Sequence, residues 1–343
     1  MYEGFYNLKE KPFNLTPDPR FIYFTERHCE ALANLVYGIR ERKGFMVLSG
    51  EVGTGKTTLV NALLDTLDRS GVLTAFIFNP ILTSPEFFEY LLTDLNLKAD
   101  PRSKSQALIK LNSLLLERYR MGQATVLIID ESQNLSSEIL EEIRLLTNLE
   151  TATEKLLQIV LVGQPELSLK LNSPELRQLK QRISLRCNLD PLTLYETKEY
   201  IKTRLEIAGL SDQQIFGDNV VAEIYRCSGG IPRLVNTICD NALLTGYACD
   251  APSIEVEIIR EVAEDLELAD IHQHPLRRAT PSRQQNFSSA ESKHFFEPKI
   301  AEPSESKHFF EPKIAEQEEE GQREDPSFDL FVQFVDKLKT RGK

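Results

Sequence analysis

Short apolar runs recur along the first part of the chain, and most are followed by stretches in which apolar residues repeat at helical spacing. Apolar runs of four to eight residues bounded by turn signals are typical of buried strands. Strands that alternate with helical patterns indicate a parallel sheet covered by helices. The pattern predicts an α/β fold with a five-stranded, doubly wound parallel sheet, whose strands lie at 44–49, 72–78, 125–129, 157–162 and 184–189.

After residue 190 the strand patterns stop, and four helical patterns follow up to about residue 268. Between the second and third of these stands GGIP at 229–232, whose glycines end one helix and whose proline opens the next. We therefore expect an α/β core over 1–190 and a small all-helical lid over 191–268.

Beyond the lid the composition becomes poor in aliphatic residues and rich in Pro, Ser and Gln, which predicts a disordered linker over 269–325. The linker contains ESKHFFEPKIAE twice, at 291–302 and 305–316, either as a spacer or as a twofold docking motif. An apolar stripe predicts a short amphipathic helix over 326–340, which either binds a protein partner or packs back onto the body.

Residues 50–57, GEVGTGKT, match G-x-x-x-x-G-K-[ST] at every fixed position. This pattern binds nucleotide phosphates when a strand precedes it and a helix follows it, as is predicted here. The loop N–H groups and the helix N-terminus supply positive potential, Lys56 would reach the outer phosphates, and the Thr57 hydroxyl would ligate Mg²⁺. The predicted nucleotide-binding residues of the loop are Gly50, Glu51, Val52, Gly53, Thr54, Gly55, Lys56, Thr57 and Thr58.

Two carboxylates, Asp130 and Glu131, directly follow the third predicted strand. They would lie at the carboxyl edge of the sheet, where open α/β sheets bind their ligands. Asp130 is expected to hold Mg²⁺ through water, and Glu131 to orient and deprotonate the attacking water. Together with the phosphate loop, the pair predicts hydrolysis of a nucleoside triphosphate.

Further polar residues complete the predicted site. Gln164 follows the fourth strand and has the chemistry to contact the γ-phosphate and the attacking water. Arg182 precedes the fifth strand, where in an oligomer it could stabilise charge on a neighbour's nucleotide, and Arg177 and Arg186 compete for this role. Arg233, in the first turn of a lid helix, could fold back over the phosphates. Ordinary turn or surface roles remain the alternative for each of them.

Charge and hydropathy limit the partners. The chain has 52 Asp and Glu against 40 Lys and Arg, a net charge of −12, and residues 271–343 contribute only −1 of it. A body this acidic does not favour generic binding to nucleic-acid backbones, although a local basic patch stays compatible with the sequence. No stretch approaches the roughly 20 apolar residues of a membrane span. We expect a cytoplasmic protein, with attachment at the inner membrane only through partners.

The order of phosphate loop, paired carboxylates, polar strand end, arginine and GGIPR resembles that of the AAA+ ATPases. More narrowly, the chain resembles the general secretion pathway protein A (ExeA-type) group, which includes ATPases of exopolysaccharide and exosortase loci. The resemblance covers about residues 1–268. Matching stretches include MYEGFYNLKEKPFNLTPDPRFIYFTERHCEAL at 1–32, GEVGTGKTT at 50–58, LIIDESQNL at 127–135, LVGQPEL at 161–167 and GGIPRLVN at 229–236.

The resemblance implies ATP as the substrate with Mg²⁺ as its cofactor, and a homo-oligomer, by family expectation a hexameric ring, in which one subunit supplies an arginine finger to the next. It implies that the segment around Pro12, Phe13 and Tyr23 packs near the adenine. It also implies catalytic roles for Lys56, Glu131, Gln164, Arg182 and Arg233, and metal-binding roles for Thr57 and Asp130.

Two functions follow from these features. The first is an ATPase that supports assembly or regulation of envelope secretion or exopolysaccharide export machinery, with a protein partner bound through the tail. Secretion-type members continue into a membrane span and a cell-wall-binding domain, whereas here a tail follows the lid. The alternative is a DNA-acting ATPase of the transposition or replication-initiation kind. Initiators usually add a winged helix after the lid, which the residues after 268 do not predict, so the transposition type remains. A nucleotide switch without turnover is disfavoured by the Asp130–Glu131 pair.

Overall fold

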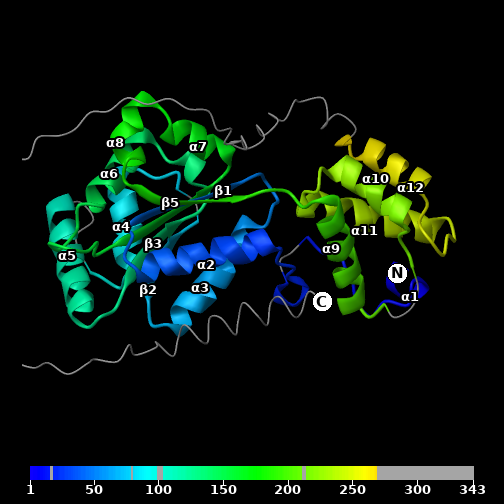
Figure 1. Ribbon diagram of the computed structural model, residues 1–343, viewed down its shortest axis with the longest axis horizontal. Helices are drawn as coiled ribbons and strands as arrows, with labels where there is room; N and C mark the ends of the chain where they lie inside the picture. Colours follow the sequence, from blue (N-terminus) through cyan, green and yellow to red (C-terminus); the bar gives the residue numbers. More distant parts are fainter. Residues whose placement is uncertain (16–17, 79, 99–102, 211–213, 269–343) are drawn as a thin grey trace, which may run out of the picture.

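The computed structural model describes residues 1–15, 18–78, 80–98, 103–210 and 214–268. The linker expected over 269–325, with its repeats at 291–302 and 305–316, and the helix expected over 326–340 lie outside these residues. Within the described part, an α/β unit lies beside a group of helices (Figure 1).

The sheet has five strands in the order β2-β3-β4-β1-β5, and every neighbouring pair is parallel. This confirms the predicted five-stranded parallel sheet, with each strand end within one residue of its expected position. The strands are β1 (Phe45–Gly50), β2 (Leu73–Ile77), β3 (Thr125–Ile129), β4 (Gln158–Gly163) and β5 (Ile183–Leu189).

Alternate residues of the central strands face two separate apolar clusters. In β1, Phe45 and Val47 belong to one cluster, whereas Met46 and Leu48 belong to the other. Helices α2 (Glu26–Arg40) and α3 (Lys56–Arg69) cover the second face (Figure 1). The first face packs against α4 (Ser84–Asp94), α5 (Lys104–Arg120), α6 (Ser137–Leu146), α7 (Pro165–Leu171) and α8 (Arg177–Lys180). Burial on both faces explains why these strands are continuous apolar runs in the sequence.

Four helices follow the sheet and form the predicted lid. They are α9 (Leu194–Ile207), α10 (Asp218–Ser228), α11 (Pro232–Ala248) and α12 (Val256–Asp265). In the described part of the chain, none of the helices has both the length and the apolar composition that crossing a bilayer requires. Short 3-10 turns lie at η1 (Pro19–Phe21), η2 (Ser132–Asn134) and η3 (Pro174–Leu176).

The N-terminal segment, residues 1–15 and 18–24, packs with the lid. Helix α1 (Tyr2–Phe5) contacts α11, and the buried side chains of Tyr2, Tyr6, Phe13 and Phe21 belong to the lid's apolar cluster. The Tyr6 hydroxyl donates a hydrogen bond to the Ala251 carbonyl at 3.0 Å. The apolar core of the lid is therefore built from two parts of the chain that are far apart in sequence.

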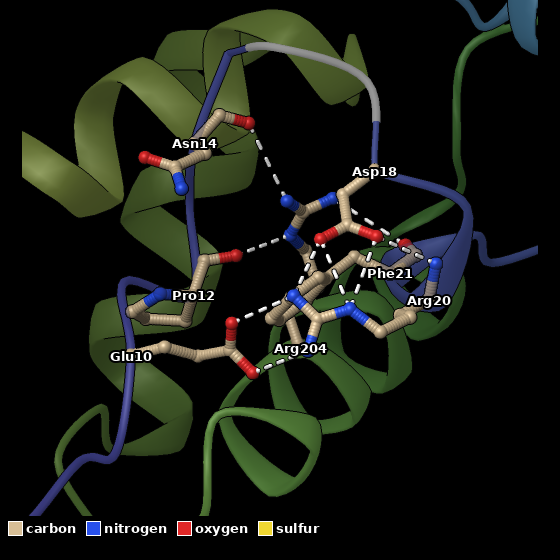
Figure 2. Close-up of polar contacts among 7 residues, drawn as sticks. All are labelled: Glu10, Pro12, Asn14, Asp18, Arg20, Phe21 and Arg204. Carbon is tan, nitrogen blue, oxygen red and sulfur yellow. Dashed lines mark hydrogen bonds and ion pairs between the residues drawn. The ribbon is translucent and has the colours of Figure 1, made fainter.

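Arg204 of α9 joins these two parts (Figure 2). Its side chain is only 7% exposed, and its guanidinium donates to the backbone carbonyls of Pro12 at 2.6 Å, Asn14 at 3.4 Å and Phe21 at 3.5 Å. The same group lies 5.0 Å from the ring centroid of Phe21 and 5.4 Å from that of Tyr200. A buried guanidinium stays charged, so these carbonyls and rings take the place of its hydration.

A close backbone contact joins Leu192, which lies between β5 and α9, to Gly230 of the lid. The Leu192 amide donates to the Gly230 carbonyl at 2.8 Å, and Gly230 has a positive φ of 74°. A Cβ on Gly230 would lie 2.0 Å from the Leu192 carbonyl oxygen, which cannot move away as a side chain could. The preceding Gly229 also has a positive φ, 59°, but a Cβ there would meet no atom of the described residues within 4 Å.

We expect Arg204→Met to lower the free energy of unfolding by about 3 kcal/mol, because two buried carbonyls and one partly buried carbonyl lose a charged donor. The matched control is Arg20→Met. Arg20 bonds Glu10 and Asp18 in the same view (Figure 2), but its side chain is 62% exposed. Urea unfolding measures both variants, and the control should keep the wild-type midpoint. Equal, small effects would contradict the anchoring role of Arg204.

The glycine pair gives a second comparison. Gly229→Ala should cost about 1–2 kcal/mol, which is the cost of a left-handed conformation for a residue with a Cβ. Gly230→Ala adds a collision with rigid backbone and should cost at least about 2 kcal/mol more. Denaturant titrations of the two variants test this difference. A Gly230→Ala protein as stable as Gly229→Ala would show that the Leu192 contact yields easily.

Candidate nucleotide-binding site

The loop between β1 and α3 forms the floor of the candidate site. Strand β1 ends at Gly50 and α3 begins at Lys56, so the strand–loop–helix context required by the sequence pattern is present. The first N–H groups of α3 have no partner within the helix and therefore leave a positive potential at this end. Both properties suit an anionic phosphate group.

Lys56 points into the loop. Its side chain is buried, and its Nζ donates to the carbonyls of Gly50 at 2.8 Å and Glu51 at 2.9 Å. Burial lowers the pKa of the Lys56 ammonium, while the nearby carboxylates of Glu131 and Asp130 oppose this change. The loop thus holds an ammonium group on backbone carbonyls that phosphate oxygens could replace.

Asp130 and Thr57 come together as the sequence predicts. Asp130 follows β3 and is 5% exposed, and its Oδ2 accepts a hydrogen bond from Thr57 Oγ1 at 3.4 Å. Burial raises the pKa of the Asp130 carboxyl, although its Oδ1 accepts the Glu131 backbone N–H at 2.8 Å. A carboxylate and a hydroxyl side by side at the phosphate loop are the oxygen ligands that Mg²⁺ prefers, so these residues fit the ion.

Glu131 sits in a hydrogen-bonded group with two glutamines. Its Oε2 accepts from Gln164 Nε2 at 3.1 Å and from Gln133 Nε2 at 2.5 Å. The Gln133 carbonyl oxygen Oε1 in turn accepts the backbone N–H of Gln164 at 3.1 Å. The structure therefore brings Glu131 and Gln164 together. Sequence reasoning missed Gln133, whose only signal was an amide two residues beyond Glu131.

Arg233 lies where α11 meets the phosphate loop. Its backbone N–H donates to the Gly53 carbonyl at 3.3 Å, and a Cβ on Gly53 would lie 2.7 Å from the Arg233 Cβ. Gly53 also has a positive φ of 82°. The absence of a side chain at Gly53 therefore lets the first turn of the lid helix rest directly on the loop, with the Arg233 side chain exposed beside it.

Arg182 lies at the opposite edge of the sheet from the phosphate loop. It precedes β5, whose first residue Ile183 pairs with Phe45, the first residue of β1. The loop begins after the six residues of β1, and at about 3.3 Å per residue this separates the two edges by about 20 Å. The Arg182 guanidinium donates to Thr147 Oγ1 at 2.8 Å. The competing arginines, Arg177 and Arg186, are both exposed.

His28 of α2 contacts the phosphate loop at Thr54, and this contact was not predicted from the sequence. Its Nε2 lies 3.0 Å from the Thr54 carbonyl, and its Nδ1 lies 2.7 Å from the Thr25 hydroxyl. Because a carbonyl oxygen only accepts, Nε2 carries the proton and Nδ1 accepts from Thr25. Burial lowers the pKa of His28, which favours this neutral form. His28 therefore supports the backbone of the loop at Thr54.

The aromatic residues expected near the adenine lie in the lid's cluster. Phe13 is buried with its ring 6.1 Å from that of Phe216, and Tyr23 has its ring 5.9 Å from that of Tyr200. Both contacts are edge-on. A role for these residues at the adenine stays a prediction.

The comparisons with known proteins concern the family and the fold. A family model described as AAA domain matches residues 39–171. General secretion pathway protein A of Aeromonas hydrophila is 44% identical over 249 residues, which are 72% of this chain and 45% of that protein.

Two groups of solved structures share the fold. Drosophila ORC bound to DNA matches with a TM-score of 0.58 and 20% identity over 76% of this chain and 66% of that one. The Aeropyrum pernix ORC2 protein in ADPNP and ADP complexes matches with a TM-score of 0.54 and 18% identity over 75% and 72% of the two chains. At such identities the likeness concerns the fold alone.

The parallel sheet, the phosphate loop, the paired carboxylates and the helical lid define a P-loop nucleotide-binding protein of the AAA type. Within this class the chain is of the ExeA type, related to general secretion pathway protein A, and the resemblance seen in the sequence is confirmed. The chain spans about half the length of that relative, at 45%.

The burial of His28 predicts a pH dependence of stability. Its pKa is lower in the folded protein than the roughly 6.5 of an unfolded chain, so below about pH 6.5 the unfolded state binds more protons. Stability should therefore fall on acidification from pH 7.5 to 5.5. A His28→Gln variant should lose less over this range, because contributions from other groups are common to both proteins. Urea unfolding at the two pH values measures this, and equal losses would contradict the assignment.

Proposed function

We propose that this chain hydrolyses ATP with Mg²⁺ and that it works as an oligomer supporting the assembly or regulation of envelope secretion or exopolysaccharide export machinery. The observation that carries the catalytic part is the joint arrangement of Lys56, Thr57, Asp130 and Glu131 around one phosphate loop. The observation that carries the biological part is the 44% identity to general secretion pathway protein A.

In this proposal the loop N–H groups and Lys56 hold the β- and γ-phosphates. Lys56 would exchange its bonds to the Gly50 and Glu51 carbonyls for bonds to phosphate oxygens. Thr57 and Asp130 would hold Mg²⁺, which when bound neutralises charge on the phosphates. Glu131 would orient the attacking water and accept its proton, with Gln164 beside it.

The position of Arg182 supports catalysis across a subunit interface. About 20 Å separates the two edges of the sheet, which is too far for Arg182 to reach the nucleotide of its own chain. A neighbouring subunit would bring its own Arg182 to that nucleotide and so stabilise the charge of the transition state. Arg177 and Arg186 remain the alternatives for this role, because both are exposed.

The contact between Arg233 and Gly53 supports a lid that responds to the nucleotide. Because α11 begins on the phosphate loop, phosphates that reshape the loop would also move the lid. The Arg233 side chain could then close over the phosphates. Such a movement would transmit the state of the nucleotide to the partner protein.

The molecule on which this ATPase acts is proposed to be a protein. The net charge of −12 disfavours generic contacts with nucleic-acid backbones, and the tail beyond residue 268 is the proposed docking segment for a partner at the inner membrane. The alternative, an ATPase that acts on DNA, rests on the fold shared with initiation proteins such as Drosophila ORC bound to DNA, at 20% identity.

Steady-state ATP hydrolysis should require Mg²⁺ and should rise per chain with protein concentration, because a neighbour completes each site. Glu131→Gln should lower kcat by at least about 100-fold, as expected for loss of a general base, while nucleotide binding persists. Arg182→Ala chains should also be inactive alone. Mixing them with Glu131→Gln chains should restore turnover, since an intact Glu131 then meets an intact Arg182.

The same assay with duplex DNA separates the two targets. Turnover that ignores DNA supports the protein target, whereas strong stimulation at moderate salt favours the DNA-acting alternative. Absence of Mg²⁺-dependent turnover at every protein concentration would contradict the catalytic proposal itself.

A further inference from the structure

Gln133 joins the two residues that face the attacking water in the proposed reaction. Its carboxamide uses both ends: Nε2 donates to Glu131 Oε2 at 2.5 Å, and Oε1 accepts the Gln164 backbone N–H at 3.1 Å. Gln164 Nε2 reaches the same Glu131 oxygen at 3.1 Å. The three residues thus form a closed hydrogen-bonded ring between the ends of β3 and β4.

The backbone that carries Gln133 is itself fixed. Ser132, fully buried, donates from Oγ to the Ile129 carbonyl at 2.7 Å, which ties η2 to the end of β3. Lys170 of α7 donates from Nζ to the Gln133 carbonyl at 3.1 Å and also to the Leu135 carbonyl. A side chain on so constrained a turn has little freedom, so its carboxamide is held in place before any nucleotide arrives.

The backbone of β4 at Gly163 also lies close to the Gln133 carboxamide. A Cβ on Gly163, the last residue of β4, would lie 2.9 Å from Gln133 Oε1. The strand therefore leaves room for this carboxamide where another residue would push it away. Of the side chains that could occupy position 133, an amide has one donor end and one acceptor end, as both contacts require.

We propose that Gln133 is a positioning residue for ATP hydrolysis: it holds the Glu131 carboxylate against Gln164, so that base and phosphate-contacting amide keep one geometry. This inference rests on the proposed ATPase function. Gln133 contacts no nucleotide in this mechanism and acts only through Glu131 and Gln164. A general base that is misplaced by an ångström loses much of its effect, so the hydrogen-bonded ring should govern kcat rather than binding.

Gln133→Met removes both hydrogen bonds at nearly constant shape and tests this role. We expect kcat to fall roughly 10- to 100-fold, the range seen when groups that orient a catalytic ligand are removed. The KM for ATP should stay within about twofold, because Gln133 contacts no nucleotide and its loss disturbs only the base that acts in the transition state. The matched control is Gln106→Met on the exposed surface of α5, which should behave as wild type.

A double-mutant cycle separates positioning from general damage. Gln164→Met alone should lower kcat, and the Gln133→Met/Gln164→Met protein should be less impaired than the product of the single effects, since both act on one carboxylate. Gly163→Ala provides a second route to this defect, although its Cβ would meet Leu167 at 2.9 Å as well as the Gln133 carboxamide. Gln133→Leu, which removes the same two hydrogen bonds, decides the matter if Gln133→Met does not fold.

The outcomes are distinct. A kcat that is unchanged or higher in Gln133→Met and Gly163→Ala overturns the proposal, as would independent, multiplicative losses in the cycle. A fall in kcat that comes with a similar rise in KM or a lowered melting temperature would also overturn it, in favour of a purely structural role. If wild-type protein hydrolyses ATP no faster than the Glu131→Gln variant, the proposed ATPase function fails instead.

Discussion

The parallel pairing of β1, β4 and β3 is the constraint on which the site depends. Because the strands run in the same direction and lie side by side, whatever follows each of them emerges at one edge of the sheet. The phosphate loop follows β1, Gln164 follows β4, and Asp130 follows β3. The pairing of the strands alone therefore brings these three separate parts of the chain together. The same register carries Arg182 to the other edge, away from the phosphate loop of its own chain.

The sheet and the phosphate loop could be predicted from the sequence because their signals are local. Strands buried on both faces are unbroken apolar runs, and the loop has fixed glycines and a lysine at fixed spacing. The contacts of Gln133 and His28 could not be predicted, because each depends on where a neighbouring backbone carbonyl or amide comes to rest. Nor does any local pattern reveal that Phe13 and Phe21 belong to the lid's core, since their partners lie almost 200 residues away.

Two different kinds of contact hold the lid. Towards the core, it touches the phosphate loop through single backbone contacts, such as that of Arg233 with Gly53, which are easily remade. Towards the N-terminal segment, it is joined by a shared apolar cluster and by the buried Arg204, which are costly to separate. If the lid moves, the N-terminal segment moves with it. Any contact of that segment with a bound base would then respond to the lid as well as to the phosphates.

The shared core of lid and N-terminal segment also bears on the order of synthesis. A ribosome makes the segment first, yet the groups that cover Tyr2 and Tyr6, in α11 and around Ala251, are added some 240 residues later. Because synthesis proceeds at roughly 5–20 residues per second, at least about ten seconds pass before the residues that bury these rings are made. During this interval the sheet can already fold, because all its strands precede the lid. The emerging chain thus carries aromatic side chains without their final cover beside a nearly finished core, and a chaperone has time to bind them.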